Sequence, residues 1–201
     1  MTDLYVGGVT FSADDRDRAH FWGEVFNLGT EPQRWIKVAI RLLDQNGTEL
    51  ARESDIVGLE WTLPGGRNPF HIRFLTPPPN WSSYDIAVSG QVHDFSDLAV
   101  PQPHTGLQVE RLHFREVERA GLRCSIVGLL SNKGVAPATH VKVAGTLYGP
   151  DGKVVGALSP YMVPRGVLSA GDALPFELKY YALGGAVANY TVQVQGRMPA
   201  V

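Results

Sequence analysis

The sequence predicts an all-β protein that contains two tandem copies of one domain. Apolar and polar residues alternate with a period of two in several segments, as half-buried strands require. No window keeps the i, i+3, i+4, i+7 spacing of an amphipathic helix. The 201 residues include 22 Gly and 14 Pro, and this turn-rich composition agrees with many short strands.

An internal repeat relates the two halves of the chain, which indicates a duplicated structural unit. A shift of 105 residues superimposes the halves as far as Leu63 and Leu168, and one extra residue in the second copy then changes the shift to 106. The matched pairs include Gly23 and Gly128, Asn27 and Asn132, Gly29 and Gly134, Pro32 and Pro137, Leu42 and Leu147, Gly47 and Gly152, Phe70 and Phe176, and Tyr84 and Tyr190.

The repeat stops between Asp94 and Gly106, in the segment DFSDLAVPQPHTG. Two prolines, a glycine and few apolar residues are typical of a short and fairly stiff linker. We therefore expect a first domain at 1–94, a linker at 95–106 and a second domain at 107–201.

Seven strands are expected in the first copy, at 4–11, 18–26, 35–44, 48–56, 57–63, 69–75 and 84–93, of which 57–63 has the weakest pattern. In the third, Ile36, Val38, Ile40 and Leu42 alternate with less apolar residues. The same alternation recurs at Phe70, Ile72, Phe74, Tyr84, Ile86 and Val88, and in the second copy at Phe176, Leu178, Tyr180, Tyr190, Val192 and Val194.

Turn signals separate these strands at equivalent places in both copies. Asn46-Gly47 and Asp151-Gly152 lie between two alternating segments, where such pairs tolerate the positive φ of a hairpin. The segments FNLGTEP and SNKGVAP form a second shared turn, and LPGG and LSAGD form a third. Each copy therefore contains the same β-hairpin, because the domain itself is duplicated.

Seven short strands in about 95 residues predict an immunoglobulin-like β-sandwich. The chain has a single cysteine, Cys124, so it forms no intrachain disulfide and hydrophobic packing must hold each sandwich together. The strand-like surroundings of Cys124 indicate a small buried residue rather than a catalytic thiol.

The order of these elements resembles the FxLYD domain family. The resemblance rests on the run G-x-x-x-N-x-G-x-x-P, the hairpin, and a closing F-x-I/L strand in each copy, and it covers most of both. The family signature is partly present at 40–44 and 145–149, where Leu42, Asp44, Leu147 and Tyr148 fit it. The resemblance implies small sandwich modules of bacterial and archaeal proteins, often outside the cytoplasmic membrane, with no established catalytic residues.

Charge and hydropathy exclude several classes of partner. Eighteen Lys and Arg are scattered among 20 Asp and Glu, so the basic surface of a nucleic-acid-binding protein is absent. No apolar run approaches the roughly 18 residues that span a bilayer, and we expect no membrane insertion by this chain. The first residues, MTDLYVGGVTF, lack the features of a signal peptide.

The sequence offers no candidate for catalysis, a cofactor or a metal. The six histidines, at 20, 71, 93, 104, 113 and 140, show no metal-ligand spacing, and we expect His71 to be solvent-exposed. The acidic run DDRDR at 14–18 is interpreted as a solvated hairpin turn rather than a calcium site. No nucleophile elbow and no phosphate-binding loop is present.

Aromatic residues of the first copy are the candidate surface contacts. The four tryptophans all lie there, at positions 22, 35, 61 and 81. Trp22 and Phe26 are out of phase with the core positions, as is Trp35, and Trp81 follows the stiff segment PPPN. The candidate surface contacts are therefore Trp22, Phe26, Trp35 and Trp81. They form a patch that binds a partner protein, a second subunit or a sugar, or alternatively they cover the domain junction or the edge of the sandwich.

We therefore expect a non-enzymatic interaction or spacer module of the bacterial cell envelope. Its contacts would come from rigid sheets, from edge strands open to β-augmentation and from the aromatic patch. Two alternatives remain open at this point: a carbohydrate-binding module that uses exposed tryptophans, and a cytoplasmic stress protein similar to late-embryogenesis water-stress proteins.

Overall fold

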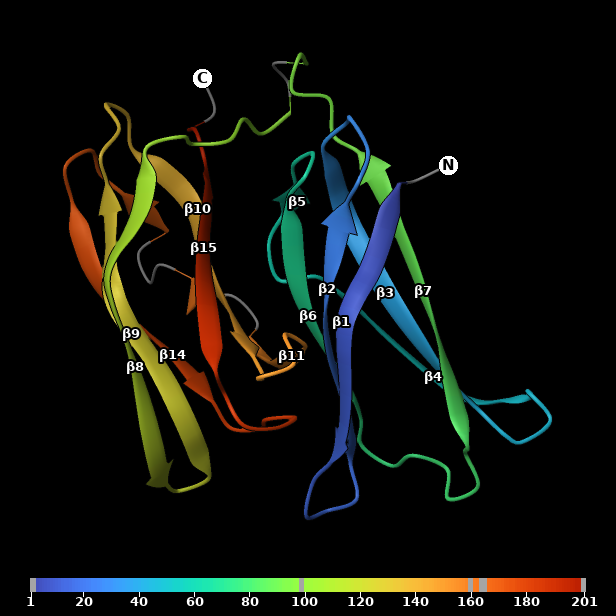
Figure 1. The fold of residues 1–201 in the computed structure, drawn as a ribbon. Helices are drawn as coiled ribbons and strands as arrows, with labels where there is room; N and C mark the ends of the chain where they lie inside the picture. The colour runs from blue at the N-terminus through green and yellow to red at the C-terminus, as the bar shows by residue number, and fades with distance from the viewer. Residues whose placement is uncertain (1–2, 98–99, 159–160, 163–165, 200–201) are drawn as a thin grey trace.

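The computed structural model describes residues 3–97, 100–158, 161–162 and 166–199. These residues form 15 β-strands and no helix, arranged in four antiparallel sheets. Figure 1 shows two sandwiches side by side, joined by the segment that follows β7. The prediction of an all-β protein with two immunoglobulin-like sandwiches is confirmed.

The first sandwich contains seven strands in two sheets. One sheet has the order β1-β2-β6, with β1 at Leu4–Ala13, β2 at Ala19–Asn27 and β6 at Arg67–Phe74. The other is centred on β3 at Gln33–Leu43, which pairs with β4 at Glu49–Ile56, β5 at Trp61–Thr62 and β7 at Ser83–Val92. Apart from the short β5, every strand begins and ends within two residues of its predicted limits.

The second sandwich repeats this plan with one strand divided. Its first sheet has the order β14-β9-β8, with β8 at Leu107–Arg119, β9 at Leu122–Asn132 and β14 at Ala173–Tyr180. In its second sheet, β10 at Ala138–Tyr148 pairs with β11 at Val154–Ala157, β12 at Tyr161–Met162, β13 at Val167–Leu168 and β15 at Asn189–Arg197. The segment equivalent to β4 thus appears as the two short strands β11 and β12.

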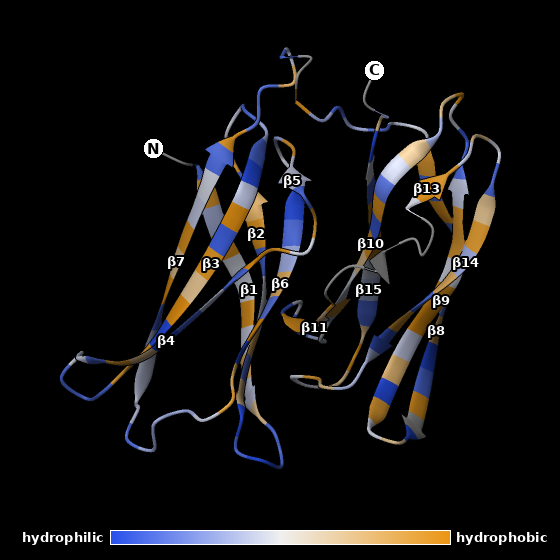
Figure 2. Ribbon diagram, turned by 180° about the vertical axis from the view of Figure 1, so that it is seen from behind, coloured by the Kyte–Doolittle hydropathy of each residue, from blue (hydrophilic) through white to orange (hydrophobic). Residues whose placement is uncertain are grey.

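Each sandwich has its own apolar core between its two sheets. Ile36, Val38, Ile40 and Leu42 from β3 are at most 1% exposed and meet Phe21 and other residues of the facing sheet. In Figure 2 the apolar positions alternate along the strands with hydrophilic ones. Burial of the alternating apolar set is the main stabilising contribution to a sandwich of this kind.

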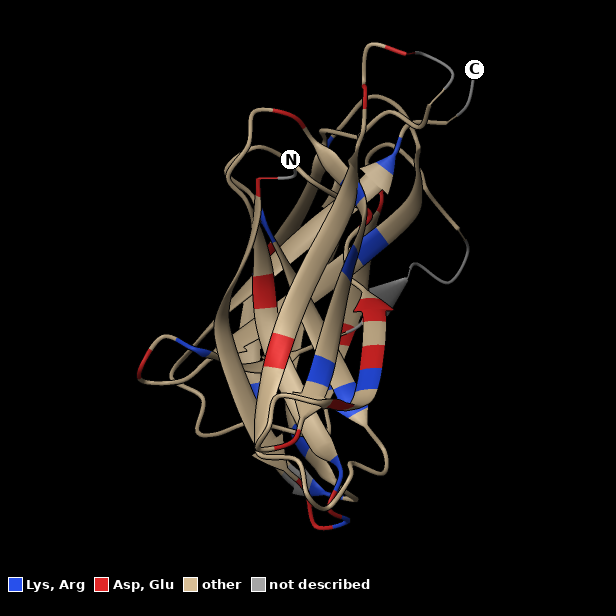
Figure 3. Cartoon of the chain, turned by 90° about the vertical axis from the view of Figure 1, so that its right-hand side faces the viewer, with Lys and Arg blue, Asp and Glu red and all other residues tan. Residues whose placement is uncertain are grey.

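The outer face of the β3-β4-β7 sheet is charged. Arg41 makes ion pairs with Asp85 and Glu49, and Arg52 pairs with Glu49 at 2.8 Å. Figure 3 shows Lys, Arg, Asp and Glu distributed along the strands of this side of the molecule.

An asparagine at the end of β2 explains why the N-x-G-x-x-P segment occurs twice. The Asn27 side-chain amide donates to the carbonyls of Glu31 (2.8 Å) and Thr62 (2.9 Å), and its Oδ1 accepts from the Gly29 amide (3.1 Å). Asn132 makes the equivalent bonds to Ala136, Leu168 and Gly134, at 2.9, 3.0 and 2.9 Å. Both side chains are at most 1% exposed. Each asparagine therefore connects the end of one sheet to the start of the other.

A β-bulge at the start of the central strand is also duplicated. The pairing of β3 with β7 shifts between Arg34 and Lys37, and that of β10 with β15 shifts between Thr139 and Lys142. Trp35 and His140 occupy the bulges with positive φ, at 50° and 49°. A bulge adds one residue to the alternation of a strand, which is why two residues, Arg34 and Trp35, separate the buried Gln33 from the buried Ile36.

The two predicted hairpins are present, and their glycines adopt the left-handed conformation. Gly47 and Gly152 have φ of 80° and 76°. Asn46 and Asp151 do not share this conformation, because the turns run from Asp44 to Thr48 and from Gly149 to Lys153. The positive φ expected of the Asn-Gly and Asp-Gly pairs is therefore adopted by their glycines alone.

Substitution of Asn27 by Ala is expected to lower the free energy of unfolding by about 2–4 kcal/mol, because two buried carbonyls and one amide lose their partner. Urea denaturation followed by tryptophan fluorescence would measure this loss. Asn80→Ala, at an exposed position, is the matched control and is expected to change stability by less than about 0.5 kcal/mol. Equal stabilities of the two variants would contradict a stabilising role for Asn27.

Candidate functional site

The junction between the two sandwiches is the most elaborate region outside the cores. The outer face of the β1-β2-β6 sheet packs against strands of the second sandwich, with β2 and β6 both contacting β11. Trp22 is 1% exposed and lies with Val154 and Ala157 in a small apolar cluster shared by the two repeats. A Cβ on Gly184 would lie 3.0 Å from the Trp22 ring, so a glycine is needed for this approach.

A buried carboxylate lies next to Trp22 in the same interface. Glu24 is 2% exposed, and its Oε1 accepts hydrogen bonds from the hydroxyls of Tyr148 (2.9 Å) and Thr146 (3.2 Å) across the junction. Arg67 lies 3.7 Å from the same oxygen and 5.5 Å from the centre of the Tyr148 ring. Burial raises the pKa of Glu24, whereas the Tyr148 hydrogen bond and the Arg67 charge oppose that rise.

A second set of polar contacts closes the other end of the junction. Arg197 donates to both carboxylate oxygens of Glu60, at 2.8 and 2.6 Å. Gln195 donates to the Trp61 carbonyl at 2.7 Å, and its Oε1 accepts from the amides of Glu60 and Trp61 at 3.1 and 3.3 Å. These contacts lie at separate points of the interface, so they resist rotation of one sandwich on the other.

A chain of hydrogen bonds from an aspartate through two histidines borders this interface. His20 Nε2 lies 3.1 Å from Asp14 Oδ2, and His20 Nδ1 lies 2.9 Å from His71 Nε2. When the Nε2 proton of a neutral His20 is donated to Asp14, Nδ1 is left to accept from His71. Both rings stack on Trp22, with centroid distances of 5.4 and 5.1 Å. Three residues distant in sequence are therefore held in one fixed order.

The environment of this chain changes the protonation of its ends. Burial lowers the pKa of His71 to about 4, assisted by the neighbouring His20 and Arg73. The Arg18 guanidinium, 2.6 Å from Asp14, holds the pKa of that carboxyl well below its usual range. At neutral pH this row of hydrogen-bonded side chains therefore has the carboxylate of Asp14 at one end and a neutral His71 at the other.

The expectation that His71 is solvent-exposed is wrong. The side chain is only partly exposed, because the Trp22 ring lies parallel to it within 5° and His20 contacts it from the side. The expected hairpin turn at 14–18 is present, closed by the Asp14 amide donating to the Arg18 carbonyl at 3.1 Å. The contact of Asp14 with His20 was not predicted, because it depends on the pairing of β1 with β2.

A cavity of about 590 Å³ opens beside the histidines, between the two repeats. Arg18, His71 and Arg73 line it from the first repeat, and Arg123 and Lys179 from the second. Among the described residues, the hydrogen-bond partner of His71 is His20, and no hydroxyl or thiol is hydrogen-bonded to it. Among these residues no group of three His, Cys, Asp or Glu is arranged to hold a metal ion.

The structure separates the four aromatic residues proposed as surface contacts. Trp22 faces away from its own core as predicted, and the second repeat covers it. Of the two alternatives, the cover of the domain junction is therefore confirmed for Trp22, and the accessible patch is wrong. Phe26 is half-buried beside Tyr5, with 6.2 Å between the ring centres. Trp81 packs edge-on against Phe11 at 5.1 Å, on the core of the first sandwich.

Trp35 alone of these four is largely exposed, at 54%. It borders a hollow of about 300 Å³ together with Ile56, Lys142 and Leu158, so it lies near the second repeat. The four side chains therefore do not form one patch.

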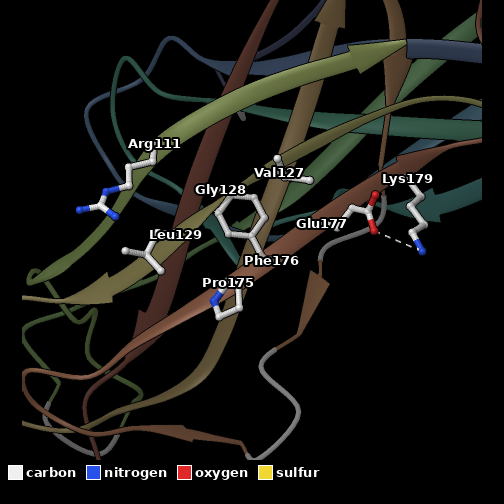
Figure 4. A pocket seen from close by; sticks show the side chains of 8 residues that line it. All are labelled: Arg111, Val127, Gly128, Leu129, Pro175, Phe176, Glu177 and Lys179. Carbon is white, nitrogen blue, oxygen red and sulfur yellow. Dashed lines mark ion pairs between the residues drawn. The ribbon is translucent and has the colours of Figure 1, made fainter. Parts of the chain in front are cut away.

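A separate hollow of about 700 Å³ lies on the outer face of the β8-β9-β14 sheet. Figure 4 shows the Phe176 ring and Gly128 at its centre, Arg111 at one end and the ion pair of Glu177 with Lys179 at the other. By the internal repeat this face is equivalent to the face of the first sandwich that carries Trp22 and Glu24.

The thiol of Cys124 has no reactive environment. The residue is 1% exposed, as predicted, and burial raises its pKa to about 11.

No helix of the described residues is long and apolar enough to cross a membrane.

Two tryptophan variants should differ sharply in stability. Trp22→Ala empties a buried contact between the repeats and is expected to cost about 3–5 kcal/mol. Trp35→Ala removes an exposed ring from a left-handed position and is expected to change stability by less than about 1 kcal/mol. Chemical denaturation of both variants measures the difference, and equal losses would contradict the burial of Trp22 at the junction.

As the pH is lowered from 7 to 5, the free energy of unfolding should decrease more steeply in the native protein than in the His71→Gln variant. An unfolded chain protonates His71 near pH 6.5, whereas the folded protein does so only near pH 4. Between these values the unfolded state binds more protons, so acidification favours unfolding, by about 1–3 kcal/mol in total. Glutamine keeps a donor for His20 and does not titrate.

Urea denaturation at pH 7, 6 and 5 would measure this difference. The groups that face His71 and remain in the variant, which are Asp14, Arg18, His20, Arg73, Arg123 and Lys179, contribute to both series. Parallel pH profiles for the two proteins would show that His71 titrates normally.

Comparisons with known proteins add only distant structural neighbours. No family model and no curated protein matches the chain. A transglutaminase from red sea bream aligns with 98% of the chain and 29% of its own length, at 11% identity and a TM-score of 0.30. The exo-chitosanase CsxA of Amycolatopsis orientalis aligns with 94% of the chain and 25% of its own length, at 15% identity and a TM-score of 0.32. A β-glucuronidase of Bacteroides uniformis aligns with 88% of the chain and 24% of its own length, at 15% identity and a TM-score of 0.28. The chain spans less than a third of the length of each of these structures.

Proposed function

We propose that this protein is a non-enzymatic spacer or interaction module, in which two sandwiches are held in one fixed orientation. The observation that carries this proposal is the junction, where Trp22 and the carboxylate of Glu24 are both buried against the second repeat. Movement of one sandwich on the other would separate the Trp22 ring and the Glu24 carboxylate from their partners, and this separation costs free energy.

The polar contacts support a mechanical role for the junction. Glu24 and Glu60 accept hydrogen bonds from the other repeat, and Arg197 contributes a bidentate pair. A bidentate pair fixes direction as well as distance. Partner-binding surfaces on the two outer sheets would therefore be presented at a constant separation.

A carbohydrate-binding role that uses the tryptophans as stacking platforms is less well supported, because of how these side chains are arranged. Trp22 and Trp61 are 1% and 2% exposed, which removes them as platforms for a sugar ring. Trp35 stands apart from Trp81, which packs on the first core. The four tryptophans therefore do not form a planar array that could bind a sugar.

The proposed location is the bacterial cell envelope, as the resemblance to FxLYD domains implies. Protease accessibility in intact cells, combined with fractionation, tests this part of the proposal. Cleavage from outside would support it, and protection in the soluble fraction would contradict it.

The fixed orientation can be tested with a pair of glycine variants. A Cβ at position 184 would lie 2.8 Å from Thr10 and 3.0 Å from the Trp22 ring, whereas one at position 185 would meet only Val155, at 3.5 Å. Gly184→Ala is therefore expected to loosen the junction and Gly185→Ala to leave it intact.

Spin labels at Ser89→Cys and Gln108→Cys, one exposed position in each sandwich, would report the distance between the repeats by electron double resonance. We expect a narrow distribution for the parent protein and Gly185→Ala, and a broader one for Gly184→Ala. A broad distribution in the parent protein would refute a fixed orientation.

A further inference from the structure

The cavity between the repeats contains more positive than negative side chains. Arg18, Arg73, Arg123 and Lys179 line it, against Asp14 and Asp15. Its walls come from both sandwiches, so the charges meet only because the junction holds the repeats together.

Two of these four cations are already paired within the protein. Arg18 is 2.5 Å from Asp14, whose carboxylate also accepts from His20. Lys179 lies 3.3 Å from Glu177 on the same strand. The charge of Asp14 is therefore neutralised locally and is not directed to the rest of the cavity.

Arg73 and Arg123 make no ion pair with any residue that the structure describes. Arg73 extends from β6 of the first repeat and Arg123 from β9 of the second. Two like charges that line one cavity repel each other, and an anion between them would remove this repulsion.

We propose that this cavity binds a small organic anion, whose oxyanion group is held by Arg73 and Arg123 from opposite repeats. Guanidinium groups suit carboxylate, phosphate and sulfate oxygens because they offer parallel donors in a plane. The volume of about 590 Å³ exceeds what a single inorganic ion fills and falls in the range typical of ligand pockets, roughly 300–1,000 Å³.

The rest of the lining accommodates a ring next to the anionic group. Tyr181 is 60% exposed at this cavity, and Leu158 and Leu183 add apolar surface. An aromatic side chain with an exposed face stacks favourably on the apolar face of a sugar. The ligand class that fits both properties is an acidic or phosphorylated sugar.

This binding role goes beyond the spacer function and does not depend on a partner protein. A ligand that contacts Arg73 and Arg123 bridges the repeats, so it would also tighten the junction. The binding proposal rests on the fixed junction, but a fixed junction can exist without a ligand, so a loss of binding alone would leave the spacer proposal standing.

The test is calorimetric titration of the full chain with four probes. Glucuronate carries a carboxylate, glucose 6-phosphate carries a phosphate, inorganic phosphate lacks the ring, and glucose lacks the charge. We expect one or both acidic sugars to bind, with an affinity at least tenfold greater than that of inorganic phosphate or glucose. Tighter binding of glucuronate or of glucose 6-phosphate then identifies the anionic group.

The double variant Arg73→Gln/Arg123→Gln is expected to weaken binding at least tenfold. Lys37→Gln/Arg52→Gln removes the same charge from the outer face of the first sandwich, away from the cavity, and should leave the affinity unchanged. Urea denaturation verifies that both variants are folded. No binding of either acidic sugar at 10 mM, or equal binding by the two double variants, would overturn the proposal.

Discussion

A carboxylate enclosed between two protein domains needs compensating hydrogen bonds or charges from the groups around it, and this requirement governs the junction around Glu24. Two hydroxyls of the second repeat and a guanidinium of the first surround a side chain that is 2% exposed. Removing one partner of a buried ionic group costs more than the pair itself contributes. A change in the arrangement of the two sandwiches would leave Glu24 without these partners, and Trp22 and the histidines beside it lie at the same interface.

Duplication supplied two equivalent sheets, and the junction shows how far they have diverged. Trp22 and Glu24 of β2 correspond to Val127 and Leu129 of β9, and His71 corresponds to Glu177. The asparagine contacts at the ends of β2 and β9 are unchanged, because they maintain each sandwich separately. The outer-face positions that contact the other repeat in the first copy have thus diverged in the second.

The strands and turns were predictable because their causes are local. Alternation in 35–44 follows from burial of one face of a strand, and the hairpin at Gly47 follows from the conformational freedom of glycine. The bulge at Trp35 was not predicted, because Trp35 beside Ile36 fits the ordinary alternation of a strand.

The site was not predictable, because alternation shows that Trp22 leaves its own core but not what covers it. The contact of Asp14 with His20, and of His20 with His71, requires the register of three strands. Sequence spacing carries no record of that register, so the histidines looked unrelated.

The ion pairs on the outer face of β3, β4 and β7 have a consequence for assembly. By the internal repeat, Arg41 and Asp85 occupy the places that Thr146 and Thr191 occupy on the face that receives the first repeat. A docking surface and its receptor on opposite sides of one molecule form a head-to-tail contact, which can continue into an open filament. Here an incoming copy would have to strip water from paired charges before it could dock. The paired charges on this face therefore oppose the docking of a further sandwich there.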